Sequence, residues 1–158
     1  MAMTIKKRAP EKLVSCAVDL AAACFNEGFN CSQAVLSACG GRFGLDREVS
    51  LKIATAFGGG MARMGGTCGA VTGAFMVIGL KHGKTKADDN NMREKTYELA
   101  KEFAARFTSR NKSIVCRDLL GHDLSTPEGR EAVKDKKLAT TLCPKFVQDA
   151  VEIVEEIV

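Results

Sequence analysis

The sequence predicts an all-α protein, a single domain folded as a helical bundle of about six to eight helices. Apolar residues recur three and four positions apart along most of the 158 residues, which is the helical period. Sustained polar/apolar alternation is missing, as are the Asn-Gly and Asp-Gly pairs that mark tight hairpins. With 46% hydrophobic and 27% charged residues, the chain has a globular composition. We expect one domain over residues 1–158, with a flexible segment at 1–9.

The first helix is predicted from Pro10 to Glu27, and Gly28 stops it. Cys16 is assigned to its apolar side, together with the stripe Leu13, Val14, Ala17, Val18, Ala21, Cys24 and Phe25.

The second helix begins after Asn30, which forms a capping box with Gln33, and ends at Gly40. Asp46 opens a third helix, which extends to Phe57 and carries Val49, Leu51, Ile53 and Ala54 as its apolar residues.

A glycine-rich break at 58–66 precedes the fourth helix, which Thr67 caps and which runs from Cys68 to about Lys81. This helix is apolar all round, so we expect it at the centre of the bundle. A polar linker at 84–91 then leads into a long amphipathic helix with the inward residues Met92, Tyr97, Leu99, Ala100, Phe103 and Phe107.

Three shorter signals complete the pattern. A short helix is expected at 113–120, capped by Ser113. Thr126-Pro127 starts another helix, because proline is favoured at the first helical position. Cys143-Pro144 starts the last one, whose inward residues are Val147, Ala150, Val151 and Val154.

Seven cysteines are the outlier of the composition. The basic residues of the start are followed by no apolar stretch long enough for a signal peptide, so we expect a cytoplasmic protein. In that compartment structural disulfides are rare, and clustered cysteines are more often metal ligands or redox thiols. An odd number also prevents complete intramolecular pairing.

The positions of the cysteines divide them into two groups. Four lie at predicted helix starts, where free N–H groups and the helix dipole favour the thiolate: Cys31, Cys68, Cys116 and Cys143. The other three are interpreted as apolar core residues: Cys16, Cys24 and Cys39. We therefore expect the first four to converge. Arg63 and Arg117 lie near them in the sequence and are interpreted as plain surface residues, with the lowering of a thiol pKa by their charge as the alternative.

These four cysteines lie in distinctive surroundings. The second begins the block Cys68-Gly69-Ala70-Val71-Thr72-Gly73, and the others lie in 29–35, 116–121 and 143–145. From about Leu13 onward the chain resembles the family of redox-active proteins named for this signature, C_GCAxxG_C_C. The resemblance implies redox activity through the four cysteines, frequent association with transporter genes, and likeness to a module of a multihaem cytochrome that also carries an iron–sulfur cluster.

Glycines near Cys68 have two interpretations. Gly66 lets the backbone turn into the helix, and Gly69 and Gly73 lie on one helical face, where they permit the close approach of a cluster or of another helix. Tight helix packing is the favoured interpretation, and Gly66, Gly69 and Gly73 are the candidates for cofactor binding in the alternative.

The favoured function is electron transfer by an iron–sulfur cluster, or another metal, on Cys31, Cys68, Cys116 and Cys143. Zinc is an alternative to iron as the metal bound by these cysteines. A thiol–disulfide oxidoreductase with Cys68 as nucleophile and no cofactor is the second hypothesis. A metal-binding accessory protein of a transporter is the third. Whether the protein is an enzyme, an oxidoreductase, stays open.

Partners are less well specified. A net charge of +4 and the absence of tryptophan argue against nucleic acid, and no apolar stretch is long enough for membrane insertion. The redox partner is unknown. The apolar fourth helix and the tail at 151–158 suit either a homodimer interface or the core of a monomer.

Overall fold

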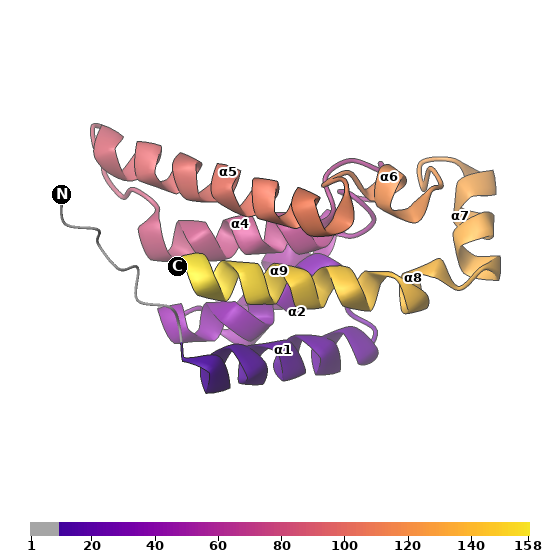
Figure 1. The fold of residues 1–158 in the computed structure, drawn as a ribbon, viewed down its shortest axis with the longest axis horizontal. Coiled ribbons are helices and arrows are strands. Elements are labelled where there is room, and N and C mark those ends of the chain that lie inside the picture. The colour runs from indigo at the N-terminus through magenta and orange to yellow at the C-terminus, as the bar shows by residue number, and fades with distance from the viewer. Residues whose placement is uncertain (1–9) are drawn as a thin grey trace.

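The computed structural model describes residues 10–158, and the regular secondary structure within them is helical apart from one isolated β-bridge. The predicted all-α bundle is therefore confirmed, while the expectation for 1–9 lies outside the described residues. Figure 1 shows the long helices side by side, with a group of short helices beyond one end.

Five helices form the body of the bundle. They are α1 (Glu11–Asn26), α2 (Cys31–Gly40), α4 (Gly69–His82), α5 (Asn90–Asn111) and α9 (Cys143–Ile157). Helix α2 packs against α1, α4 and α9, while α5 covers the outer side of α4 and α9. Since α9 packs against all four other long helices, the fourth helix shares its expected central position with α2 and α9.

The remaining helices are short. A 3-10 turn, η1 (Gly41–Phe43), follows α2, and α3 (Arg47–Ala54) with η2 (Thr55–Phe57) packs on α2. Beyond the bundle end lie α6 (Cys116–Leu120), α7 (Pro127–Asp135) and the unpredicted single turn α8 (Leu138–Thr141).

Local capping explains where several helices begin. Asn30 and Gln33 form the predicted capping box, in which each side chain accepts the backbone N–H of the other residue. Asp46 and Thr126 cap α3 and α7 as expected. Thr67 is not the cap of α4, because Cys68 occupies that position and Thr67 pairs with Val115 in the isolated bridge.

Apolar side chains from the long helices fill one core. Its aromatic part is a chain of ring contacts that joins α4, α5 and α9, formed by Phe75, Phe103, Phe107 and Phe146. The apolar residues at 151–157 are used within this core, including the buried Val151, Val154 and Ile157.

Some residues that the helical pattern placed inward are on the surface. Cys16 is exposed, so its assignment to the core is wrong, whereas Cys24 and Cys39 are buried as predicted. Other exposed positions are Leu13, Val49, Ile53 and Tyr97. A periodic pattern cannot place the edge of the packed face of a helix.

No helix along residues 10–158 combines the length and the apolar content that crossing a membrane requires.

Candidate functional site

The four predicted helix-start cysteines all lie at helix starts in the structure. Cys31 and Cys143 are the first residues of α2 and α9, Cys116 is the first residue of α6, and Cys68 is the N-cap of α4. Three long helices, α2, α4 and α9, therefore direct their N-terminal ends, which carry partial positive charge, toward these thiols.

The thiols come together from these separate elements. Every pair among Cys31, Cys68, Cys116 and Cys143 interacts electrostatically. The closest relationship is a side-chain hydrogen bond between Cys31 and Cys143. We call these four residues the cysteine cluster. The three cysteines of the other predicted group do not take part in these interactions: Cys16, Cys24 and Cys39.

Backbone pairing fixes the relative positions of Cys68 and Cys116. The N–H of Cys68 donates to the carbonyl of Ile114 at 2.8 Å, and the N–H of Cys116 donates to the carbonyl of Gly66 at 2.7 Å. These bonds flank the bridge between Thr67 and Val115. Since the bridge joins residues far apart in sequence, no local pattern could have predicted it.

Close helix packing fixes Cys31 against α4. A Cβ at Gly69 would lie 3.3 Å from the Cβ of Cys31 and 3.0 Å from the N of Ser32. A Cβ at Gly73 would lie 2.9 Å from the carbonyl oxygen of Ser32. Both glycines therefore allow α2 and α4 to approach at the cluster. What the structure shows at Gly69 and Gly73 is this packing, and the role of Gly66, Gly69 and Gly73 toward a cofactor stays a prediction.

Burial dominates the protonation of two cluster thiols. It raises the pKa of Cys68 to about 12, although the N–H groups of Ala70 and Val71 oppose the rise by hydrogen bonding to the thiol. Burial, with a smaller contribution from Cys143, raises the pKa of Cys116 to about 11. Both thiols are therefore protonated at neutral pH in the metal-free protein.

The hydrogen-bonded pair behaves differently. The hydrogen bond from Cys31 lowers the pKa of Cys143, since it stabilises the Cys143 thiolate, and burial opposes this. The same bond, followed by burial, raises the pKa of Cys31. Cys143 is therefore the cluster thiol that ionises most readily.

The two arginines do not act on the thiols. Arg117 directs its guanidinium to the carbonyls of Gly65 and Met64, and neither Arg117 nor Arg63 contributes to the pKa of a cluster cysteine. Both arginines are exposed, so the predicted surface role is confirmed, while the alternative, a lowered thiol pKa, is wrong for this structure. Arg117 acts on the backbone of the glycine-rich segment instead.

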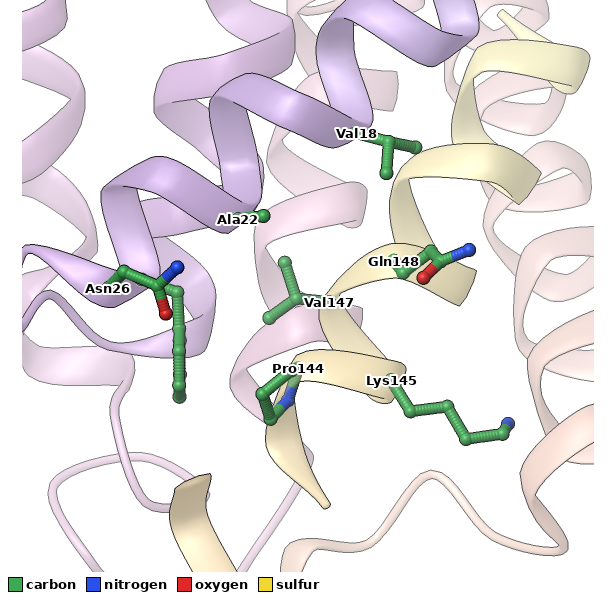
Figure 2. A pocket seen from close by; sticks show the side chains of 8 residues that line it. Val18, Ala22, Asn26, Pro144, Lys145, Val147 and Gln148 are labelled. Carbon is green, nitrogen blue, oxygen red and sulfur yellow. The ribbon is translucent and has the colours of Figure 1, made fainter. Parts of the chain in front are cut away.

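A pocket of about 270 Å³ lies between α1 and α9 near the start of α9 (Figure 2). Val18, Ala22 and Val147 form apolar walls, while Pro144 directly follows Cys143. None of the four cluster cysteines lines this pocket. This pocket therefore gives no direct access to the cluster thiols.

The thiols are not arranged as ligands of a single ion. Along the described chain, no three His, Cys, Asp or Glu side chains are grouped so that they could hold one metal ion.

A helical fold organised around four mutually interacting cysteines defines the class of protein. The family model described as Putative redox-active protein (C_GCAxxG_C_C) matches residues 29–157, and the chain belongs to this family. The protein is thus cysteine-rich and redox-active by family. Comparison with curated proteins and with solved structures found no match.

Proposed function

We propose that this protein transfers electrons with an iron–sulfur cluster held by Cys31, Cys68, Cys116 and Cys143. The observation that carries the proposal is the mutual interaction of four thiols from four helix starts. Clusters of the [2Fe–2S] and [4Fe–4S] types are held by four cysteine thiolates, the number and type of donors gathered here.

The environment of the thiols also fits such a group. The N-terminal ends of α2, α4 and α9 would stabilise the negative charge of the thiolates. An iron–sulfur cluster, once bound, supplies one-electron redox chemistry, and the chain supplies the thiolates and a largely buried setting. A single zinc ion needs four sulfurs, each about 2.3 Å from the metal. No such group is formed among the described residues, and zinc stays the alternative to the cluster.

The test is purification without oxygen, followed by a visible spectrum and by assays for iron, zinc and acid-labile sulfide. We expect iron and sulfide, and we expect Cys68→Ser to abolish both. Cys24→Ser is the matched control, because Cys24 is also buried but lies outside the cysteine cluster. Equal loss of iron and sulfide from both variants would contradict the proposal. A folded wild-type protein without iron would also contradict it.

The hydrogen bond between Cys31 and Cys143 favours a second candidate, a thiol–disulfide oxidoreductase. In this case the Cys143 thiolate attacks a partner disulfide and forms a mixed disulfide, releasing one partner thiolate. Cys31 then displaces the second partner thiolate, passing its proton to it. The partner disulfide gains two electrons and becomes one thiol and one thiolate, which takes its proton from water, and Cys31 and Cys143 become a disulfide.

This version assigns the nucleophile to Cys143 instead of Cys68, whose raised pKa makes its thiolate scarce. It is distinguished by peptide mapping of the metal-free protein after oxidation. A Cys31–Cys143 disulfide that forms reversibly would support it, and random pairing among all seven cysteines would oppose it. Association with a transporter, a homodimer and a cytoplasmic location stay predictions.

A further inference from the structure

The glycine-rich segment contains an unusual left-handed turn. Five consecutive residues, Gly59 to Arg63, have positive φ values of 65, 68, 63, 49 and 62°. Three of them, Met61, Ala62 and Arg63, carry side chains, and L-residues rarely adopt this conformation in succession. Such a backbone persists only where the surrounding structure holds it in place.

This turn lies directly on Cys116. A Cβ at Gly60 would lie 2.7 Å from the Cβ of Cys116 and 2.6 Å from the N of Gly66, so only glycine fits. The carbonyl of Gly60 accepts the N–H of Gly66 at 2.9 Å, and Gly66 in turn accepts the N–H of Cys116. The turn and Cys116 are thus joined by a short chain of backbone hydrogen bonds, and Cys116 is only 7% exposed.

Arg117 fastens the end of the segment that follows the turn. Its Nε donates to the carbonyl of Gly65 at 3.1 Å and its Nη2 to that of Met64 at 3.4 Å. The backbone N–H of Arg117 also donates to Gly65. Since the side chain is 51% exposed and its neighbour Asp123 is 3.9 Å away, these carbonyls are its closest partners.

We propose that the left-handed turn Gly59–Arg63 is a cover that keeps solvent and oxidants from the Cys116 thiol, and that Arg117 is the positioning residue that holds it closed. Removing the Arg117 side chain takes away its two bonds to the carbonyls of Gly65 and Met64 and leaves only the backbone bond to Gly65, so the turn opens more often. The proposal concerns access to the cysteine cluster of the proposed function, but it requires no bound cofactor.

The experiment measures thiol accessibility one cysteine at a time. Reduced, metal-free protein is treated with iodoacetamide at fixed pH, and the alkylation rate of each cysteine is followed by peptide mass spectrometry. In Arg117→Ala we expect Cys116 to react about tenfold faster, the factor that corresponds to the loss of one charge-assisted hydrogen bond. Cys24, buried in another part of the bundle, should react at its original rate.

Arg130→Ala is the matched control, because Arg130 also donates to two loop carbonyls, those of Leu124 and Ser125, without touching the turn. It should leave the rate of Cys116 unchanged. If Arg117→Ala speeds the alkylation of all cysteines equally, the variant has failed to fold. The selective change in the rate of Cys116 is then tested in Arg117→Lys. An unchanged Cys116 rate in a folded Arg117 variant overturns the proposal, whatever cofactor the wild-type protein holds.

Discussion

Two glycines in α4 show how closely the backbones of neighbouring helices approach each other. Gly73 faces Ser32 and Val35 of α2, whereas nothing lies within 4 Å of the position where a Cβ on Gly79 would be. The two glycines are six residues apart on one helix, so they separate the effect of packing from that of helix propensity.

We therefore expect Gly73→Ala to destabilise the protein by about 1–3 kcal/mol, since the added methyl group would be forced against a backbone carbonyl. Gly79→Ala should stabilise it by about 1 kcal/mol, because alanine is the better helix former and meets no neighbour. Urea unfolding measures both changes. A stability gain in both variants would show that α2 and α4 are farther apart than described.

Single residues also show where prediction from sequence stops. Asn30, Asp46 and Thr126 could be identified as caps because a cap contacts residues two or three positions away. Cys16 could not be placed, because both sides of its helix carry apolar residues and only packing decides which side is buried. The hydrogen bond between Cys31 and Cys143 joins residues far apart in sequence and left no local signal.

At the scale of elements, helix starts carry the site. The pattern of caps and apolar spacing was sufficient to predict the long helices and to group four cysteines at their starts. Two elements were missed: the long-range bridge between Thr67 and Val115, and the local left-handed turn at 59–63. The paired glycines Gly59-Gly60 and Gly65-Gly66 mark the turn in the sequence, but the positive φ of the residues between them has no sequence signature.

Capping of α2 should matter to the cysteine cluster as well as to stability. Asn30→Ala and Asp46→Ala each remove a helix cap and should each cost about 1 kcal/mol in urea unfolding. Only Asn30 precedes a cluster cysteine, so only Asn30→Ala should raise the alkylation rate of Cys31 in the reduced protein. The same rate in both variants would indicate that the cap does not hold Cys31 in place.

At the scale of the whole molecule, the end of α2 opposite to Cys31 carries a buried ion pair. The Glu155 carboxylate, 1% exposed, lies 2.7 Å from the Arg42 guanidinium, and it also interacts with the Cys39 thiol. Burial raises the pKa of Glu155, while Arg42 and then Cys39 oppose the rise. Because this pKa is higher in the folded than in the unfolded chain, ionised Glu155 costs stability at neutral pH, and the cost disappears as the pH falls through the raised value.

Arg42→Ala should thus destabilise the protein at pH 7 by about 3 kcal/mol, because it leaves a buried carboxylate without its cation. The loss should be smaller at a lower pH, where the unpaired carboxyl group takes up a proton. Urea unfolding at both pH values is the measurement, and adding Glu155→Gln should restore much of the stability at pH 7. A loss that is independent of pH would rule out this origin.

The four cluster cysteines also have an order in time. A ribosome releases Cys31 first and Cys143 last, with 111 residues between them. Because α9 supplies the last thiol, the earlier three emerge without their full set of neighbours, and Cys31 lacks its hydrogen-bonding partner until α9 has been made. The cluster is therefore completed only when synthesis has passed Cys143. A metal or a native disulfide found at this site would show that the nascent chain already includes the start of α9.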